Sequence, residues 1–230
     1  VVRNCVVYGN QADEHGGGLN FVDLSHAMVL QCSVYGNTTL NRGSGLFVHD
    51  GAAEVYGSIF ANNNRITMYE NSSGSTIAVE HCTFHATDTG VFYDDGTTPV
   101  LNVDGPGGLN DLVATASDNA YADPVFRSPA TGDFHLLDTS PCIDLLASGY
   151  AADDVDGEPR PEGAGADTGA DEYIDTDGDG MPDWWESRHG LSTSEDDADG
   201  EDRLTEEGEG RGDEVGVEAA HVGLAVEEPG

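Results

Sequence analysis

The sequence predicts an all-β fold, a parallel β-helix, from a repeat in its first hundred residues and from the composition of that repeat. Four segments of similar sequence follow one another between residues 1 and 105. Their spacing falls within the roughly 20–50 residues that are typical of solenoid repeats. Short apolar runs alternate with Gly and Asn in these segments, which favours stacked strands joined by turns over paired helices.

The repeat is anchored on Cys5, Cys32, Ser58 and Cys82, which are 27, 26 and 24 residues apart. A valine stands three residues before each anchor (Val2, Val29, Val55 and Val79). An apolar residue stands two residues after it (Val7, Val34, Phe60 and Phe84). Five residues after it comes Asn10, Asn37, Asn63 or, in the fourth copy, Thr87. A glycine and an apolar residue come later (Gly18-Leu19, Gly45-Leu46 and Gly90-Val91), with the third copy unclear around Met68.

These spacings describe one coil of a parallel β-helix. Side chains alternate between the two faces of a strand, so the anchor and the residue two positions later share one face. The valine three positions before the anchor is out of phase, so a bend must separate the two. Each coil is therefore a strand, a bend, a second strand and a turn whose asparagines can form a hydrogen-bonded ladder. On copies such as Val-Leu-Gln-Cys-Ser-Val-Tyr-Gly-Asn, residues 1–105 resemble the repeats of right-handed parallel β-helix proteins.

The cysteines of the repeat are expected to be buried in one interior column, where they act as small hydrophobes. Stacked neighbours would lie within disulfide reach by Cα distance, but parallel side chains suit a bridge poorly. With Cys142 elsewhere, the four cysteines indicate no disulfide framework, and their spacings are far from those of a zinc site.

Residues 106–172 are predicted to cap the solenoid, whose last coil would otherwise expose an open edge and an apolar interior. Pro and Gly punctuate short apolar runs here, which indicates extended loops and strands. The motifs in order are Asp123-Pro-Val-Phe126, Gly132-Asp-Phe-His-Leu136, Ser140-Pro-Cys-Ile-Asp144, Gly157-Glu-Pro-Arg160 and Asp167-Thr-Gly-Ala-Asp-Glu172. This order resembles the choice-of-anchor Q segment that ends many secreted bacterial β-helix proteins. One departure is that Leu145-Leu146 stand where that family has a glycine.

Residues 175–186 fill every liganding position of a twelve-residue calcium loop. Carboxylates stand at positions one, three, five, nine and twelve (Asp175, Asp177, Asp179, Asp183 and Glu186). Gly180 stands at position six, where the backbone must turn sharply, and Met181 at position seven offers its carbonyl. Ca²⁺ takes about six to eight oxygen ligands, so the loop predicts a calcium site with Ca²⁺ as the cofactor. A solvated acidic turn is the alternative.

The loop resembles the Asp-rich calcium repeats of thrombospondin type 3 and dockerin-like tails, including the Gly190-Leu191 pair that follows it. Residues 184–189 can form a short exiting helix with Gly190 as its cap, but the segment before Asp175 is too short for an entering helix. Residues 173–197 are therefore half of an EF-hand at most. This setting favours a constitutive calcium staple over a calcium sensor that opens and closes.

The end of the chain carries a weaker signal. A second loop could start at Asp197, but Asp202 stands where glycine is needed and Gly208 stands at position twelve. Residues 198–230 are acidic and rich in Gly, without sustained periodicity, and are expected to be disordered.

The chain of 230 residues carries 44 acidic residues against 8 basic ones, all arginine, for a formal net charge of −36. Such a field repels nucleic acid and anionic membrane surfaces and attracts divalent cations. No stretch approaches the roughly 18 apolar residues that a membrane-spanning helix needs. Because the chain begins within a repeat, it is expected to be a fragment of a longer protein, which the resemblances place outside the cell or on its surface.

Three functions remain open from the sequence. The first is a structural or adhesive surface protein with a calcium-ordered tail, whose partners would be extracellular polysaccharide or cell-surface components. The second, implied by the likeness of many β-helix proteins to pectate lyases, is a polysaccharide lyase or glycoside hydrolase. No catalytic residue is assigned for it, because Lys is absent and acidic pairs such as Asp94-Asp95 are adjacent in sequence, so an active site would lie on other coils. The third is carbohydrate binding along the solenoid face by Tyr8, Tyr35 and Tyr56, of which Tyr8 and Tyr35 share one column and Tyr56 does not.

Overall fold

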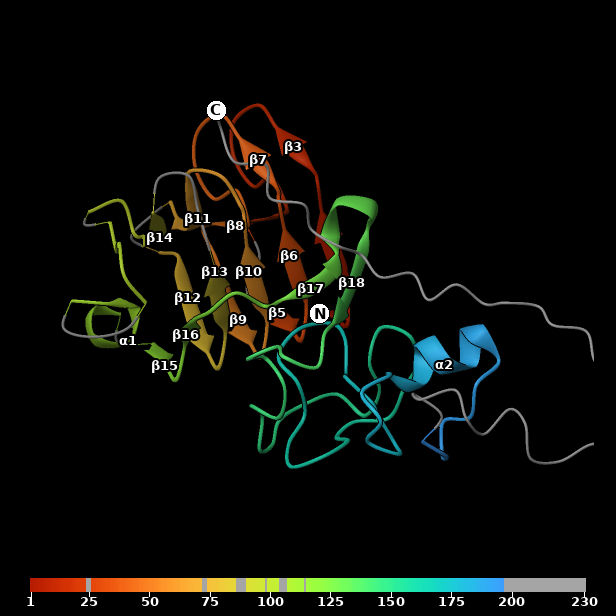
Figure 1. Ribbon diagram of the computed structural model, residues 1–230. Helices are drawn as coiled ribbons and strands as arrows, with labels where there is room; N and C mark the ends of the chain where they lie inside the picture. The colour runs from red at the N-terminus through yellow and green to blue at the C-terminus, as the bar shows by residue number, and fades with distance from the viewer. Residues whose placement is uncertain are drawn as a thin grey trace, which may run out of the picture.

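The structure is a computed structural model that describes residues 1–196 except 24–25, 72–73, 86–89, 98, 104–106 and 114. Its first half is a parallel β-helix, in which successive coils stack their strands into three parallel sheets (Figure 1). The predicted all-β class is therefore confirmed.

Each sheet collects one strand from successive coils. The first holds β1 (Val2–Arg3), β5 (Ala27–Leu30), β9 (Ala52–Tyr56), β12 (Thr76–Glu80) and β15 (Ala116–Ser117). The second holds β2 (Val6–Tyr8), β6 (Ser33–Tyr35), β10 (Ile59–Ala61), β13 (Thr83–His85) and β16 (Ala120–Tyr121). The third holds β4 (Leu19–Val22), β8 (Leu46–His49), β11 (Ile66–Glu70) and β14 (Val91–Asp94).

Shorter elements complete the chain. Strands β3 (Gln11–Ala12) and β7 (Thr38–Thr39) form a separate parallel pair. Strands β17 (Phe126–Ser128) and β18 (Asp133–Leu136) form an antiparallel hairpin through the 3-10 turn η1 (Pro129–Thr131). The α-helices are α1 (Leu109–Leu112) and α2 (Asp183–His189).

The strand register confirms the two apolar columns predicted from the repeat. In the first sheet the stacked residues are Val2, Val29, Val55 and Val79. In the second sheet they are Val7, Val34, Phe60 and Phe84. Both columns belong to one core cluster, in which the members from the second coil onward are almost completely buried. Burial of these stacked side chains is the main stabilising term of the solenoid.

The predicted bend is a single residue with a left-handed backbone immediately before each anchor. The φ angle is 50° at Asn4, 47° at Gln31, 55° at Gly57 and 53° at His81. Gly and Asn adopt this region at little cost, whereas Gln and His do so less often. The turn passes the chain from the first sheet to the second, so that the valine and the anchor both face the interior although their spacing is out of phase.

The predicted asparagine ladder is present in the coils that the structure describes. Asn10 Nδ2 donates to Asn37 Oδ1 at 3.0 Å, and Asn37 Nδ2 donates to Asn63 Oδ1 at 3.0 Å. The same two acceptor oxygens also take the backbone N–H groups of Asn10 and Asn37, each at 3.0 Å. The ladder thereby satisfies buried polar groups at the turn. Its expected fourth member, Thr87, lies outside the described residues.

The parallel sheets extend beyond residue 105 into the segment predicted to be a cap. Ala116 and Tyr121 pair with β12 and β13, in line with the valine and anchor-plus-two columns. Asn119 takes the anchor position, and its Oδ1 accepts the N–H of Cys82 at 2.9 Å. Asp118 supplies the left-handed bend with φ at 53°. The repeat pattern did not predict this coil, because Asn119 lies 37 residues after Cys82. In addition, the anchor is an asparagine here, whereas the earlier anchors are cysteine or serine.

One alignment within the repeat was wrong. Leu19, Leu46 and Met68 stack in the third sheet, which identifies Met68 as the third-copy residue. In the fourth copy, however, Tyr93 pairs with Met68, whereas Val91 pairs with Ile66. The column therefore continues two residues later than the Gly90-Val91 pair indicates. A shift of two preserves the face of the strand, so Tyr93 is buried in the core cluster in place of Val91.

All four cysteines are free, and three are buried. Burial raises the pKa of Cys32 and Cys82 to about 12 and that of Cys142 to about 11. Cys5, in the first coil, is partly exposed.

We therefore expect iodoacetamide at pH 8 to modify Cys5 rapidly in the folded protein and the other three only after unfolding, because the thiolate is the reactive form. Mass spectrometry of timed samples would measure this, with Cys5→Ser as the control. Two or more fast thiols in the native protein would contradict it.

The segment that follows β14 covers the end of the solenoid and, beyond β16, its side. At the end, Leu109 of α1, which precedes the last coil, is buried in the core cluster. The chain then returns along the second sheet, where the β17–β18 hairpin lies beside β6 and β2 (Figure 1). Bend residues hold this return segment, since Gln31 Oε1 accepts the N–H of Ala151 and Asn4 Nδ2 donates to Asp153. The segment predicted to cap the end of the solenoid therefore also covers its second sheet.

The hairpin also changes the interpretation of the tyrosine column. Tyr8 and Tyr35 do stack in register on β2 and β6, and Tyr56 lies in another sheet, as predicted. Phe134 packs against both rings, with centroids 4.9 Å from Tyr8 and 5.3 Å from Tyr35. Phe126 adds a further contact to Tyr35 at 6.0 Å. These tyrosines therefore serve as the docking surface for the hairpin, although Tyr8 remains 48 % exposed.

A buried arginine organises the loops beyond the hairpin. The side chains of Arg160 and Glu172 are both 0 % exposed, and their Nη1 and Oε2 atoms are 3.5 Å apart. Arg160 also donates to the carbonyls of Asp167 at 2.9 Å and Gly169 at 3.1 Å. Gly169 in turn donates its N–H to the Gly57 carbonyl of the solenoid at 2.9 Å. The arginine therefore supports the backbone through which these loops contact the β-helix.

Candidate metal centre

The predicted calcium loop brings three alternating carboxylates together. One oxygen from each of Asp175, Asp177 and Asp179 lies within 4.8 Å of those of the other two. The backbone fixes this arrangement, because Gly178 and Gly180 donate their N–H groups to the two oxygens of Asp175 at 2.9 and 3.1 Å. Both glycines are left-handed, with φ at 76° and 90°. The result is a tight turn with its carboxylates gathered at one place.

Two oxygens of this group are shielded from solvent and have no hydrogen-bond partner in the described part of the chain, Asp177 Oδ2 and Asp179 Oδ2. The Oδ1 atoms of the same residues accept backbone N–H groups from Asp179 at 3.2 Å and Met181 at 2.7 Å. Desolvation and repulsion from Asp179 and Asp175 raise the pKa of Asp177. Shielded carboxylate oxygens without a partner are costly, and an all-oxygen donor set of this kind suits Ca²⁺.

The other predicted ligands lie differently. The Asp183 carboxylate accepts the N–H of Thr176 at 2.8 Å and the hydroxyl of Thr176 at 2.6 Å, so it braces the first turn of the loop. Glu186 is 0 % exposed within α2, and Met181 is partly buried after the turn. The structure thus gathers three of the five predicted carboxylates, and Asp183 lies outside that group, bonded to Thr176.

Helix α2 follows the loop and ends as predicted at Gly190, whose φ is 72°. Trp184 attaches this helix to the hairpin. Its ring lies 4.5 Å from that of His135, and the Arg127 guanidinium lies 4.3 Å from its centroid. Stacking and cation–π attraction therefore hold α2 against β17 and β18. The second loop expected from Asp197 to Gly208 and the acidic segment 198–230 lie outside the described residues.

A second group of metal-ligating side chains was not predicted from the sequence. One ligand atom from each of His135, Asp156 and Asp171 lies within 4.8 Å of the other two. His135 is on β18, whereas the two aspartates come from loops later in the chain. No local motif joins residues so far apart in sequence, so only the tertiary fold reveals the group.

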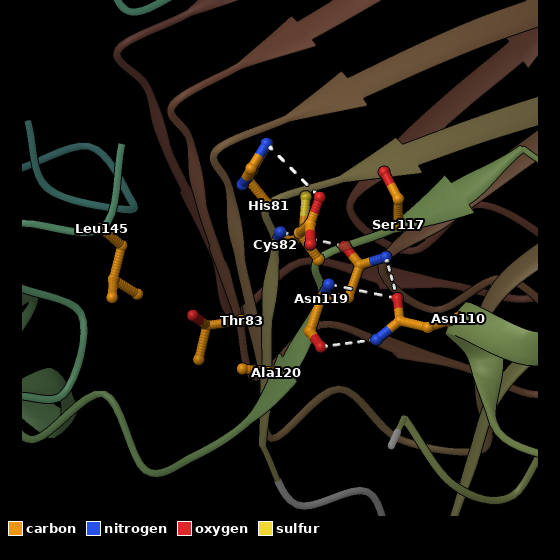
Figure 2. A pocket seen from close by; sticks show the side chains of 9 residues that line it. His81, Cys82, Thr83, Asn110, Ser117, Asn119, Ala120 and Leu145 are labelled. Atoms are coloured by element: carbon orange, nitrogen blue, oxygen red, sulfur yellow. Dashed lines mark hydrogen bonds and ion pairs between the residues drawn. The ribbon is translucent and has the colours of Figure 1, made fainter. Parts of the chain in front are cut away.

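A hollow of about 720 Å³ lies beside the last coil. Figure 2 shows side chains that line it, among them His81, Asn110, Asn119 and Leu145. The two amides in it are bonded to each other and to the backbone. Asn119 Nδ2 donates to Asn110 Oδ1 at 2.8 Å, and Asn110 Nδ2 donates to the Asn119 carbonyl at 2.7 Å. These side chains hold the coil in place rather than face a ligand.

Comparisons with models of protein families, with curated proteins and with solved structures give no match for this chain. The resemblances to choice-of-anchor Q segments and to dockerin-like tails therefore stay predictions. Neither helix within the described residues has the length and apolar character needed to cross a membrane.

Proposed function

We propose that residues 175–186 bind one Ca²⁺ ion and that Asp175, Asp177 and Asp179 are its principal ligands. The observation that carries this proposal is the meeting of three carboxylates within 4.8 Å, two of which present shielded oxygens without a hydrogen-bond partner. Desolvation and then repulsion from Asp179 and Asp175 raise the pKa of Asp177, and bound Ca²⁺ would neutralise that repulsion. Calcium on the order of millimolar, as found outside cells, occupies even weak loops.

At the level of the whole chain, we propose a structural or adhesive β-helix of an extracellular or cell-surface protein. Its calcium loop would bind the ion permanently, and the ion would stabilise the loop. Two features support this proposal. The parallel β-helix repeats its hydrogen bonding along its axis, and Trp184 packs the helix that follows the loop against the hairpin, which itself packs on the β-helix. Because the described residues before the loop contain no entering helix and α2 is held by the hairpin, calcium would order the segment and would not move one helix relative to another.

Calcium uptake tests the proposal. Isothermal titration of the chelator-treated chain with Ca²⁺ is expected to show binding at millimolar or lower concentration. Asp179→Ala is expected to weaken that binding at least about tenfold, because it removes a charged ligand from the site. Asp13→Ala, which removes an exposed aspartate of the first coil, is the matched control and should bind as the unmodified chain does.

Hydrogen exchange locates the effect. Adding Ca²⁺ is expected to slow exchange in residues 173–190 and to leave the strands of the β-helix unchanged, because a ligand stabilises the state that binds it. No heat of binding at millimolar Ca²⁺, or equal binding by Asp179→Ala and Asp13→Ala, would refute the calcium assignment.

A further inference from the structure

We propose that His135, Asp156 and Asp171 form a second cation site, separate from the calcium loop, that takes a divalent transition-metal ion such as Zn²⁺. The three residues meet where β18, the turn that contains Gly157 and the segment before Glu172 come together. Imidazole nitrogen is a preferred ligand of Zn²⁺ and its neighbours in the transition series, whereas Ca²⁺ selects oxygen alone. The two sites therefore differ in the chemical class of ion they would bind.

The distance between two of the ligands fits such an ion. His135 Nε2 and Asp156 Oδ2 are 3.3 Å apart. Two ligands that each lie about 2.0–2.1 Å from a tetrahedral Zn²⁺ are themselves about 3.3 Å apart. Asp156 lies on the exposed rim of the group, with 47 % of its side chain accessible, which provides a path for entry.

A buried carboxylate oxygen of Asp171 is a second, independent observation that points to a bound ion. The residue is only 3 % exposed, and its Oδ1 is shielded from solvent without a hydrogen-bond partner in the described chain. Its Oδ2 accepts the N–H of Leu136 at 2.6 Å, which fixes the carboxylate beside His135. Burial and repulsion from Asp154, Glu158 and Asp156 hold the pKa of Asp171 well above its usual range. A bound dication would relieve that repulsion.

The imidazole is oriented for metal binding by a partner on its other side. His135 Nδ1 lies 2.7 Å from Asp133 Oδ1, and Arg127 holds the other Asp133 oxygen at 3.1 Å. Metal-binding histidines commonly donate one ring N–H to a carboxylate, which turns the second nitrogen toward the metal. Trp184 covers the face of the imidazole at 4.5 Å, so the ring cannot easily turn away.

The competing explanation is a proton in place of the metal. In that case His135 is doubly protonated against Asp133 and Asp156, and Asp171 carries a proton of its own. The two explanations differ in the state of His135 Nε2, which bears hydrogen in one and metal in the other. They also differ in whether the full chain binds Zn²⁺ at this place.

The test is a Zn²⁺ titration of the chelator-treated full chain in saturating Ca²⁺. The tightest Zn²⁺ equivalent is expected to disappear in Asp171→Asn and in His135→Gln, and to weaken about 10- to 100-fold in Asp133→Ala. His26→Gln, which alters an exposed histidine paired with Glu54 at 3.0 Å, is the matched control and should keep that equivalent. Asp171→Asn retains an oxygen for the Leu136 N–H, and far-UV circular dichroism would verify that each variant folds.

Two further readouts separate the outcomes. In ¹H–¹⁵N spectra, Zn²⁺ is expected to shift His135 Nε2 while Nδ1 keeps its proton. Asp177→Asn is expected to impair calcium binding and leave the tightest Zn²⁺ equivalent intact, so this site and the calcium loop can fail independently. Zn²⁺ binding that is equal in Asp171→Asn, His135→Gln and His26→Gln, or an unshifted Nε2 resonance, would overturn the proposal.

Discussion

Phe60→Ala is expected to lower the free energy of unfolding by about 3–5 kcal/mol, the loss typical of a large side chain removed from a packed core. Phe60 is 0 % exposed and stacks on Phe84 with ring centroids 5.8 Å apart. Its ring also lies beside Gly45, where an added Cβ would come within 2.9 Å of Phe60 Cδ1. Since the backbone is this close on one side and the column continues on the other, the cavity has little room to collapse.

Urea denaturation followed by far-UV circular dichroism would measure this loss. Leu40→Ala is the control, because Leu40 is 63 % exposed and its removal should change stability by less than about 0.5 kcal/mol. A loss below about 1 kcal/mol for Phe60→Ala would contradict the stacked column as the core of the β-helix.

Arg160→Met is expected to cost about 3–5 kcal/mol, because removing one member of a buried ion pair leaves the other uncompensated. Glu172 would lose its cation, and the carbonyls of Asp167 and Gly169 would each lose a donor. Asp167, whose pKa burial already raises to about 7, would lose a nearby positive charge as well. Chemical denaturation at pH 8 would measure the loss, with Arg3→Met at the exposed pair with Asp153 as the control.

The loss from Arg160→Met is expected to be larger at pH 8 than at pH 5. Removing the arginine raises the folded-state pKa of Asp167 and Glu172 further above the unfolded values. The folded state then binds more protons than the unfolded one, so stability falls as the pH rises from the unfolded pKa near 4 through the folded pKa near 7 and above. Equal losses at both pH values would show that packing, not the buried charge, accounts for the effect.

The repeat region could be predicted from the sequence because its determinants are local and periodic. The valine column, the Phe60–Phe84 column and the Asn10–Asn37–Asn63 ladder follow from spacing alone, and the register confirms them. Where the spacing changed, the prediction failed. Asn119, 37 residues beyond Cys82, was not predicted to be an anchor. Tyr93, and not Val91, pairs with Met68 in the third sheet.

The contacts that join the later segment to the solenoid could not be predicted in this way. Arg160 meets Glu172, and His135 meets Asp156 and Asp171, only because the loops fold back on one another. The calcium loop was predictable as far as its local turn, which gathers Asp175, Asp177 and Asp179. Asp183 instead accepts two hydrogen bonds from Thr176, a contact that spacing does not reveal.

The attachment of α2 has a practical consequence for spectroscopy. The chain has 2 tryptophans, Trp184 and Trp185, and both lie on this one helix. Trp184 contacts His135 and Arg127, and Trp185 stacks on His189 at 4.0 Å. Indole fluorescence excited at the red edge therefore reports on the junction between the acidic loop and the hairpin and is blind to the solenoid, which makes it a natural local reporter for ions that bind on either side of Trp184.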